Sequence, residues 1–498
     1  MKRFDITTYI KALEDADLLI SYDLKDNTEL PVSYLTFNSK EVVEGTLFIC
    51  KGVTFKEQYL LESLKSGASC YITEIPYPNA EEYPNILVKD IRKAMPILAN
   101  IYDNQPWKEL CITAVGGTKG KTTTSFFLKG IADAYLASSG DVPCGLMSTI
   151  EVFDGVTTTP TRRTTPEAVE LQHILRRCVD NKVKRLCMEV SSQGFKYDRV
   201  AGMRFDVTIF LNIGEDHISP NEHSDFDDYL DSKMMMFPMS DKTVVNLDID
   251  HVDRVLEGSK AAKEVFTYSS KRDDADYKVY NIHKDGIDTV FSIKGPDMNE
   301  EFRISLPGLF NVDNAAAAII ASYQTGIPME FIKKGIYGAN AEGRMEIYAS
   351  SDNSVLCVVD YAHNGFSFQK LFESVKEEYP DRYVIALFGL PGGKAYTRRQ
   401  ETGTIAGQFA DEIVLTADDP ANEKVIDICN EVAEYIKPSG TPYTIIEDRE
   451  EAVAWAIENA PENSIILLMG KGAETNQAVG NGYVPCLSDA QAAKKYLK

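Results

Sequence analysis

The sequence lacks the features that mark disulfide-stabilised, zinc-binding and membrane-spanning proteins. Its nine cysteines are odd in number and scattered, and no two of them form a CxxC pair, so neither a disulfide framework nor a zinc site is expected. No segment approaches the roughly 18 consecutive apolar residues of a membrane span. The opening stretch MKRFDITTYI has no apolar run after its basic residues. We therefore expect no signal peptide and no membrane association, and we expect a cytoplasmic protein.

Basic side chains are also in short supply. The chain carries 52 lysines and arginines against 75 aspartates and glutamates, which gives a formal net charge of −23. A nucleic acid or an anionic membrane needs an extended basic surface, so both are excluded as partners. Small anionic substrates stay open, provided that positive side chains gather locally.

What the chain does have is length and a regular alternation of strand-like and helical patterns. The chain has 498 residues, 44% of them hydrophobic, which is too many for a single hydrophobic core. At roughly 150 residues per domain, this length predicts about three domains. Buried strands that alternate with helices are typical of parallel sheets covered on both faces. We predict an α/β fold with domains at 1–107, 108–342 and 343–498. The strand-like segments behind this prediction are GTLFIC, ASCYITE, PNILVKD, LCITAV, RLCMEV, FDVTIFLNI, VLCVVDYA, YVIALFG, DEIVLTA and SIILLMG.

The segment AVGGTKGKTTT (114–124) is the clearest functional signal. It follows an apolar run and precedes a helical pattern, which is the order of a phosphate-binding loop. Backbone N–H groups of such a loop bind phosphate oxygens, its lysine adds charge, and a threonine hydroxyl ligates Mg²⁺. Val115 stands where the common spacing has glycine, so a glycine-rich turn without a ligand is the alternative. The candidate phosphate-binding residues are Gly117, Thr118, Lys119, Gly120, Lys121, Thr122 and Thr123.

Two further residues are singled out by their positions. Glu189 ends the apolar run RLCMEV, where the carboxyl edge of a parallel sheet faces the loop, so we assign it to Mg²⁺. In residues 223–237, a capping signal from Ser224 and Asp227 precedes a helical face that carries Lys233 among apolar side chains. A lysine there is costly unless it is paired or chemically altered. The alternative is that its stem lies along the apolar surface and its ammonium reaches water.

The phosphate loop resembles the TGTxGKTT loop of the Mur ligases, with Gly116 in place of the first Thr. Further motifs of that family follow in order along nearly the whole chain, and the opening FNSKEVVEGTLFICKG (37–52) resembles the family pattern DSRxVxxGxLFxAxxG. One such motif is a weak signal. The same order of so many motifs, however, identifies the chain as similar to the family over nearly its whole length. The motifs are RRTTPE (162–167), MEVSSQG (188–194), FLNIGEDH (210–217), FNVDNAAAA (310–318), EGRMEI (342–347), VDYAHNG (359–365), TADDPANE (416–423) and MGKGAE (469–474).

The resemblance implies a small N-terminal UDP-binding domain, a central ATP-binding P-loop domain and a C-terminal Rossmann-like domain that binds an amino acid. It implies that ATP, with Mg²⁺, phosphorylates a carboxylate of UDP-N-acetylmuramoyl-L-alanyl-D-glutamate, and that the amine of a free amino acid attacks the acyl phosphate. This reaction belongs to peptidoglycan precursor synthesis. Phosphoryl transfer needs mainly positioning and cationic stabilisation, which the loop can supply. We expect a monomer.

The resemblance also implies roles for individual residues. It implies catalysis by Lys121, Lys233 and His217, with Lys233 carbamylated. The implied Mg²⁺ ligands are Thr122, Glu189, His217 and Lys233. For ATP it implies Asn311 near the base, Arg344 near the phosphates and Asp360 at the ribose. For the UDP-dipeptide it implies Ser39, Lys40, Thr164, Thr165, Ser191 and Arg199. For the amino acid it implies Lys394, Asp418, Asp419, Gly470 and Glu474.

Three departures from the family bear on the substrates. Tyr197 stands where the family often has glutamine, and Lys394 stands in place of the arginine expected at the amino acid's α-carboxylate. Members that add meso-diaminopimelate carry DNPR, whereas this chain has Asp418, Asp419, Pro420 and Ala421. Ala421 cannot bind a second carboxylate as arginine does, so we predict L-lysine as the added amino acid.

Ornithine and meso-diaminopimelate remain alternative amino acids. A different ATP-dependent ligase on the same scaffold, such as a relative of folylpolyglutamate synthase, is a second alternative, against which the opening motif in residues 37–52 argues. A nucleotide-dependent switch that hydrolyses ATP without ligation is a third.

Overall fold

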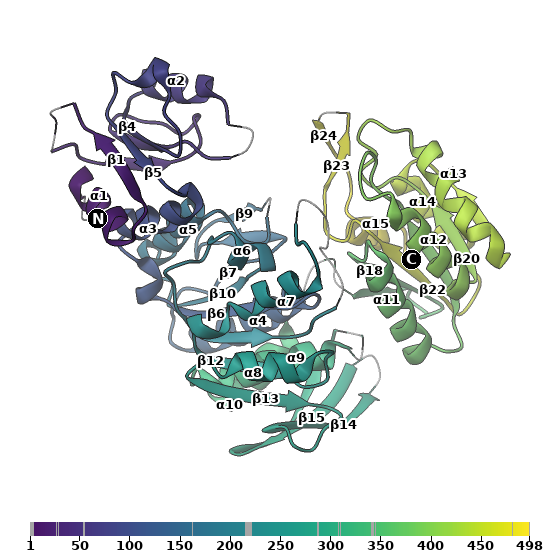
Figure 1. The fold of residues 1–498 in the computed structure, drawn as a ribbon. Coiled ribbons are helices and arrows are strands. Elements are labelled where there is room, and N and C mark those ends of the chain that lie inside the picture. The colour runs from purple at the N-terminus through teal and green to yellow at the C-terminus, as the bar shows by residue number, and fades with distance from the viewer. Residues whose placement is uncertain are drawn as a thin grey trace. The chain divides into compact units, whose positions relative to one another are not determined.

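The computed structural model describes residues 4–25, 27, 29–52, 55–161, 163–214, 222–285, 288–306, 308, 310–339, 343, 345–480 and 482–497. The chain is mixed α/β throughout (Figure 1), as the sequence predicted. By contacts it forms two compact units. The first comprises Met1–Tyr280, Ile293–Asn299 and Ala316–Ile336, and the second comprises Asn281–Ser292, Glu300–Ala315 and Tyr337–Lys498. The domain boundaries near 107 and 342 stay a prediction.

The first hundred or so residues form a five-stranded sheet in the order β1-β5-β4-β3-β2. Only β1 runs antiparallel to its neighbour. The strands are β1 (Leu19–Asp23), β2 (Tyr34–Thr36), β3 (Thr46–Ile49), β4 (Ala68–Thr73) and β5 (Asn85–Val88), and the helices are α1 (Ile6–Asp15), α2 (Glu57–Lys65), η1 (Pro78–Ala80) and α3 (Ile91–Tyr102). The side chain of Asp90 caps α3 by accepting from the N–H groups of Arg92 and Lys93 at 2.9 and 3.1 Å.

An eleven-stranded sheet follows, in the order β16-β15-β14-β13-β12-β11-β6-β10-β7-β8-β9. Its centre, from β13 to β7, is parallel and buried, as predicted for strands that alternate with helices. The antiparallel edge β8-β9 was not predicted. The strands are β6 (Cys111–Gly116), β7 (Gly145–Met147), β8 (Glu151–Phe153), β9 (Thr158–Pro160), β10 (Arg185–Glu189), β11 (Phe205–Phe210), β12 (Ser240–Asn246), β13 (Glu264–Ser269), β14 (Tyr277–Asp285), β15 (Asp288–Gly295) and β16 (Met298–Ile304).

Helices connect the strands of this sheet. They are η2 (Pro106–Glu109), α4 (Lys121–Ser138), α5 (Ala168–Asp180), α6 (Ser192–Lys196), α7 (Phe226–Met234), η3 (Phe237–Met239), α8 (Val252–Ser259), α9 (Phe310–Gln324) and α10 (Met329–Gly338). Apolar side chains of the strands and of α5 and α7 form one continuous core, which fixes where the carboxyl ends of β6, β10 and β11 lie. These three neighbouring strand ends hold the candidate site.

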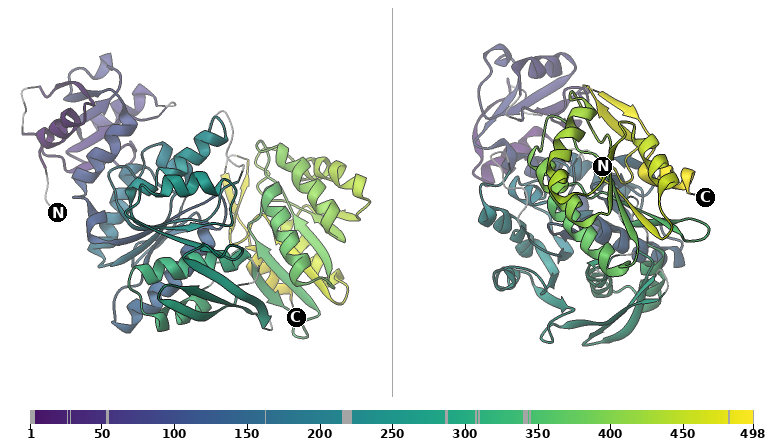
Figure 2. Two further views of the ribbon diagram at one scale, coloured as in Figure 1. Left: turned by 60° about the horizontal axis from the view of Figure 1, so that its bottom comes forward. Right: turned by 90° about the vertical axis from the view of Figure 1, so that its right-hand side faces the viewer.

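The last part of the chain forms a six-stranded sheet in the order β17-β18-β22-β19-β20-β21, parallel except for β17. Along the chain, the strands β18, β19, β20 and β21 are added toward one edge of the sheet, and β22 then returns to lie between β18 and β19. Because the direction reverses, right-handed crossovers place helices on both faces of the sheet (Figure 2). The elements are β17 (Glu346–Ala349), β18 (Val355–Asp360), α11 (Gly365–Glu378), β19 (Tyr383–Phe388), α12 (Thr397–Phe409), β20 (Glu412–Leu415), α13 (Val425–Ile436), η4 (Lys437–Ser439), β21 (Tyr443–Ile445), α14 (Arg449–Asn459), β22 (Ser464–Met469), the hairpin β23 (Asn476–Val479) and β24 (Gly482–Pro485), and α15 (Asp489–Tyr496).

Two expectations from composition can be compared with the structure. All nine cysteines are free thiols, and most of them are buried. Within the described part of the chain, none of the helices combines the length and apolar character needed to cross a membrane.

Candidate functional site

The phosphate loop joins the end of β6 to the start of α4. Gly120, at the N-cap of α4, has a φ of +83°, a left-handed conformation that glycine adopts at little cost. A Cβ on Gly117 would lie 3.0 Å from the Cβ of Leu211, so the backbone packs too closely there for a side chain. The two glycines therefore shape the turn that precedes the helix N-terminus, as the sequence predicted.

Asn212, which follows β11, holds the loop from the neighbouring strand. Its side-chain Oδ1 accepts from the N–H of Lys119 at 2.8 Å, and its Nδ2 donates to the Lys119 carbonyl at 3.0 Å. Its own carbonyl accepts from the N–H of Thr118 at 3.1 Å. Sequence analysis included Asn212 only as part of a motif, because nothing local shows that its side chain reaches the loop.

Two lysines converge on this loop from different helices. The Lys121 Nζ donates to the carbonyls of Gly117 and Thr118 at 2.9 and 3.1 Å, and the Lys233 Nζ donates to the Gly117 carbonyl at 2.8 Å. Lys233 is only 2% exposed, and its ammonium lies 4.7 Å from the ring centroid of Tyr229. The ammonium therefore does not reach bulk water, which was the alternative considered for Lys233.

Helix α7 carries Lys233 on a buried face with Tyr229 and Leu230, as predicted. The predicted cap was wrong by one residue. Asp225, in extended backbone directly before the helix, accepts from the N–H of Asp228 at 2.8 Å, and the Ser224 hydroxyl instead donates to Asp225.

Glu189 lies at the end of β10, where its register partner on β6 is Val115. Its carboxylate is fully buried and accepts from the N–H and the hydroxyl of Thr149, both at 2.9 Å. The Thr149 hydroxyl also lies 3.1 Å from that of Thr164. Thr149 thus fixes the predicted metal ligand, although no sequence pattern marked it. Thr122, the other predicted ligand on the loop, is buried in the first turn of α4.

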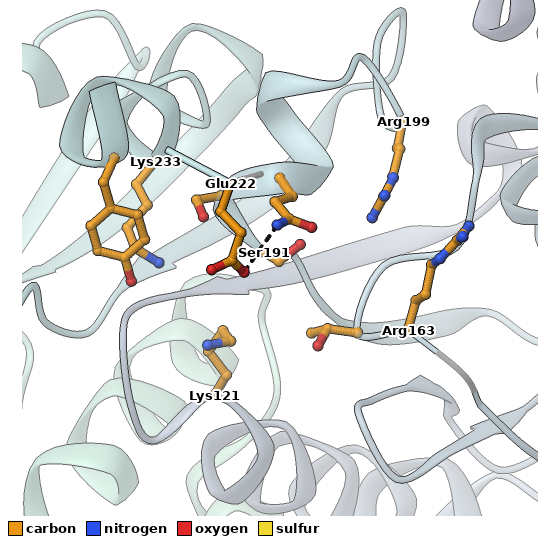
Figure 3. Close-up of a pocket in the computed structure, with 10 residues that line it drawn as sticks. Lys121, Arg163, Ser191, Arg199, Glu222 and Lys233 are labelled. Atoms are coloured by element: carbon orange, nitrogen blue, oxygen red, sulfur yellow. Dashed lines mark hydrogen bonds between the residues drawn. The ribbon is translucent and has the colours of Figure 1, made fainter. Parts of the chain in front are cut away.

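A cavity of 240 Å³ lies beside the loop and brings five predicted residues together (Figure 3). We call it the cationic cavity. In Figure 3, Arg163 and Arg199 lie at one end, and Lys121 and Lys233 lie at the other. Sequence analysis missed Arg163, Gln193 and Glu222. The lining residues are Lys121, Arg163, Thr164, Ser191, Ser192, Gln193, Arg199, Glu222, Tyr229 and Lys233.

Other predicted substrate residues lie around the cavity or away from it. Thr165 is fully buried, and its hydroxyl accepts from the N–H of Ser191 at 3.0 Å, so it supports the lining. Ser39 and Lys40 lie on the loop after β2, where the Asn38 Oδ1 accepts from the N–H of Lys40 at 3.1 Å. They belong to the five-stranded sheet and do not line the cavity.

A second charged cluster lies in the six-stranded sheet unit. Carboxylate oxygens of Asp418, Asp419 and Glu474 lie within 4.8 Å of one another, and we call these three residues the acidic cluster. The buried Lys471 Nζ lies 2.9 Å from Asp419, 2.9 Å from Glu474 and 3.9 Å from Asp418. Burial raises the pKa of Asp418 to about 6, although Arg449 and Lys471 oppose this rise. Lys471 was missed because its motif, MGKGAE, gives no sign of the distant aspartates.

The remaining predicted residues have mixed outcomes. Asp360 ends β18 and accepts from the N–H groups of Ala362 and Met345 at 2.8 and 3.0 Å. Asn311 is buried in α9, and its Oδ1 accepts from the Asn314 side chain at 3.0 Å. The roles of both stay predictions.

In the same unit, Gly470 follows β22 with a φ of +109°, which explains the glycine. Lys394 is exposed in the loop before α12, while the nearby Arg399 is buried and paired with Glu423 and Glu431. His217 and Arg344 lie outside the described residues.

Two family models match the chain. The Mur ligase middle domain matches residues 115–322, and the Mur ligase glutamate ligase domain matches residues 343–472. Over 99% of its length the chain is 35% identical to a UDP-N-acetylmuramyl-tripeptide synthetase of Ligilactobacillus salivarius, 99% of which is covered. Over 93% of its length it is 37% identical to a UDP-N-acetylmuramoyl-L-alanyl-D-glutamate--L-lysine ligase of Streptococcus agalactiae, 92% of which is covered.

Among solved structures, a UDP-N-acetylmuramoyl-L-alanyl-D-glutamate--2,6-diaminopimelate ligase shares the fold. The TM-score is 0.68 at 23% identity, covering 100% of this chain and 99% of that chain. A phosphate loop on a parallel sheet, together with matches to ligases over nearly the whole chain, defines the class as an ATP-dependent ligase. The chain belongs to the Mur ligase family, as its motifs predicted.

Proposed function

We propose that this protein joins L-lysine to UDP-N-acetylmuramoyl-L-alanyl-D-glutamate in an ATP-dependent reaction that releases ADP. The observation that carries the proposal is the cationic cavity, where Lys121 and Lys233 meet beside the phosphate loop and Arg199 and Ser191 line the same space. Such a cavity suits a substrate that carries a carboxylate close to the phosphates of a nucleotide. The names of the relatives from Ligilactobacillus salivarius and Streptococcus agalactiae support this substrate.

The chemistry follows from the charges. A carboxylate is a poor electrophile at neutral pH, and transfer of a phosphoryl group to it creates a leaving group that an amine can displace. The C–O bond to phosphate breaks as the C–N bond forms, and the amine loses a proton. Lys121 lowers the cost of negative charge that spreads over the transferring group, and Arg199 and Ser191 hold the acid in line.

ATP and Mg²⁺ fit the residues that are present. The left-handed Gly120 and the crowded Gly117 form the kind of turn that cradles phosphates. Glu189 is buried beside the loop, and among the described residues its two oxygens accept from Thr149 alone, so lone pairs remain for a hard cation. Bound Mg²⁺ would neutralise phosphate charge, and Thr122 and Glu189 would hold it. Asp360 and Asn311 are proposed contacts to the nucleoside.

We further propose that Lys233 is carbamylated. Its amine is buried against Tyr229 and the Gly117 carbonyl, and burial favours the neutral amine over the charged ammonium. Addition of CO₂ to the neutral amine forms a C–N bond, releases one proton and leaves an anion suited to Mg²⁺. The check is ¹³C NMR of enzyme in ¹³C-bicarbonate, where a carbamate signal that is absent from Lys233→Ala is expected.

L-Lysine is the proposed amino acid because the three carboxylates of the acidic cluster pair with one cation among the described residues, Lys471, while the nearby Arg449 is already paired with Asp489. The surplus negative charge suits an ammonium at the tip of the substrate's side chain. Ala421 supplies no cation for the second carboxylate of meso-diaminopimelate. We assign the substrates to three domains, UDP to 1–107, ATP to 108–342 and the amino acid to 343–498.

One assay tests the proposal. Purified protein is given ATP, Mg²⁺ and UDP-N-acetylmuramoyl-L-alanyl-D-glutamate, with lysine, ornithine or meso-diaminopimelate in parallel, and ADP and the extended product are measured. The expected result is ADP release that depends on both substrates and is fastest with lysine. ADP release without either substrate would instead indicate a nucleotide switch. Extension of a folate in place of the UDP-substrate would indicate a relative of folylpolyglutamate synthase.

A further inference from the structure

Glu167 lies at the centre of a cluster of three cationic side chains. Its Oε1 accepts from the Arg163 Nη1 at 2.7 Å and lies 3.1 Å from the Arg199 Nη2, and its Oε2 accepts from the Lys51 Nζ. The side chain of Glu167 is 9% exposed, that of Lys51 is 13% exposed and that of Arg199 is 10% exposed. The contacts with Lys51 and Arg199 are therefore shielded from solvent and are stronger than surface ion pairs, whereas the Arg163 side chain is 53% exposed.

The cations around Glu167 come from two different sheets. Lys51 follows β3 of the five-stranded sheet, and its ammonium lies 5.1 Å from the ring centroid of Phe37. Phe37 directly precedes the loop with Ser39 and Lys40, which is proposed for the UDP group. Arg163 and Arg199 line the cationic cavity near the phosphate loop. One carboxylate thus contacts groups at both places where a long substrate would bind.

The charge balance of the cluster favours an ionised Glu167. Burial alone would raise the pKa of Glu167, but Arg199, followed by Lys51 and Arg163, outweighs burial and holds the pKa below its usual range. Burial, together with the nearby Arg163 and Arg199, lowers the pKa of Lys51 in spite of its contact with Glu167. One anion among these cations leaves a surplus of positive charge for an acidic ligand.

Arg199 provides an independent sign of a ligand. One of its guanidinium nitrogens donates to the Thr165 carbonyl at 3.1 Å, and another lies beside Glu167. Its Nε is buried and makes no hydrogen bond to any residue that the structure describes. The Arg199 guanidinium is thus held by Thr165 and Glu167, and its Nε–H is a buried donor that an anion in the cavity could satisfy.

On the basis of the proposed function, we propose that Glu167 is a positioning residue that couples the two ends of the UDP-dipeptide substrate. Its carboxylate orients the guanidinium groups of Arg163 and Arg199 toward the cavity that would bind the acidic dipeptide. Its contact with Lys51 links these arginines to the loop that would bind the UDP group. Without the carboxylate, the three cations repel one another and the arginines lose their shared anchor.

The variant Glu167→Gln tests this, because it keeps the shape of the side chain and removes its charge. We expect the Kd of UDP-N-acetylmuramoyl-dipeptide, measured by calorimetry, and its KM to rise about tenfold, while the KM of ATP changes less than twofold. Asp180→Asn, at the exposed far end of the same helix where Asp180 pairs with Arg176, is the matched control and should behave as wild type. A wild-type Kd and KM in Glu167→Gln, or equal rises in both KM values, would overturn the proposal.

Lys51 variants provide a second test that leaves Glu167 in place. Lys51→Met should raise the Kd about threefold, and Lys51→Arg should restore it. Lys89→Met removes an exposed lysine of the same sheet that pairs with Asp17, and it should have no effect. The double variant Lys51→Met/Glu167→Gln should bind the UDP-dipeptide no more weakly than Glu167→Gln alone. Additive effects of the two substitutions on Kd would contradict the coupling.

This test is separable from the test of the proposed function. If wild-type protein fails to bind the UDP-dipeptide or to extend it with any amino acid, the proposed function is wrong. If wild-type protein binds and extends it and the Glu167 and Lys51 variants match wild type, only the role of Glu167 is wrong.

Discussion

The cationic cavity and the acidic cluster differ in the groups that contact their buried charges. In the cavity, Lys121 and Lys233 rest on backbone carbonyls of Gly117 and Thr118. In the acidic cluster, three carboxylates surround one permanent cation, the Lys471 ammonium. A carbonyl carries only a partial charge, whereas each carboxylate around Lys471 carries a full charge when it is ionised. The cavity is lined by more cations than anions, while Lys471 balances part of the negative charge of the acidic cluster.

This difference indicates how each place selects its ligand. A cavity lined by more cationic than anionic side chains attracts anions strongly. The acidic cluster, with three carboxylates around Lys471, has a small surplus of negative charge. This surplus suits a single ammonium group, and it favours amino acids whose side chain places an ammonium at that position. We infer that the cavity contributes most to the rate of reaction and that the acidic cluster contributes most to the choice of amino acid.

The largest effect is expected from Lys121→Ala. Loss of this ammonium removes a cation that contacts the phosphate loop, and we expect kcat to fall by about 10³-fold or more, as for other groups that stabilise a transferring phosphoryl. The measurement is ADP release coupled to product formation. Lys129→Ala is the control, since Lys129 lies further along α4 and pairs with Asp133 at 2.5 Å. Ligation at the normal rate in Lys121→Ala would remove the basis for the proposed site.

A smaller and more selective effect is expected in the acidic cluster. Asp419 accepts from Lys471 and from the N–H of Ala478 at 2.9 and 3.0 Å. In Asp419→Asn, we expect the KM of lysine to rise about 30-fold with kcat reduced less, because an attractive charge is lost near the amino acid. Asp427→Asn, at an exposed position in the first turn of α13, is the control. A fall in kcat with an unchanged KM would place the lysine elsewhere.

The acidic cluster should also give lysine binding a pH dependence. Asp418 is buried, which raises its pKa to about 6, so it is ionised above that pH and becomes neutral below it. The attraction for an ammonium is lost as pH falls through 6, and we expect the KM of lysine to rise about tenfold between pH 7.5 and pH 5. Asp418→Asn should show a higher KM and a flatter profile. A wild-type profile in that variant would assign the pH dependence to another group.

The sequence predicted those parts of both clusters that are carried by local patterns. The glycines at 117 and 120 and the buried face of α7 follow from backbone geometry and helical periodicity, so they were predictable. Thr149, Lys471 and Glu167 were not, because each acts through a partner far along the chain. Asp225 was missed as a cap because several acidic and hydroxyl residues lie side by side, and only the backbone conformation decides among them.

Fold class was predictable for a related reason. Runs such as SIILLMG are apolar throughout, which indicates strands buried on both faces. The antiparallel extension at β8-β9 was missed because its strands are short and exposed, so they leave little pattern in the sequence.

The smallest effect is expected outside both clusters, at His173. Its Nδ1 lies 2.6 Å from Asp103, and its Nε2 lies 2.9 Å from the Leu35 carbonyl. Only the imidazolium can donate to both acceptors. Burial lowers the pKa of His173, but the hydrogen bond and charge of Asp103 outweigh burial, so the pKa is raised above 6.5. The extra stability is therefore complete below pH 6.5 and is lost as pH rises through the raised pKa.

In His173→Gln, we expect a loss of about 1 kcal/mol of stability at pH 6, which is the usual net contribution of a hydrogen bond. The loss should narrow as pH rises through the raised pKa of His173 and the wild-type imidazole becomes neutral. Thermal unfolding of both proteins across this range is the measurement, and His283→Gln, at an exposed histidine, is the control. A loss that widens with pH would mean that neutral His173 makes the better contacts. Because His173 contacts neither the cationic cavity nor the acidic cluster, the KM values of ATP and lysine should stay at their wild-type levels.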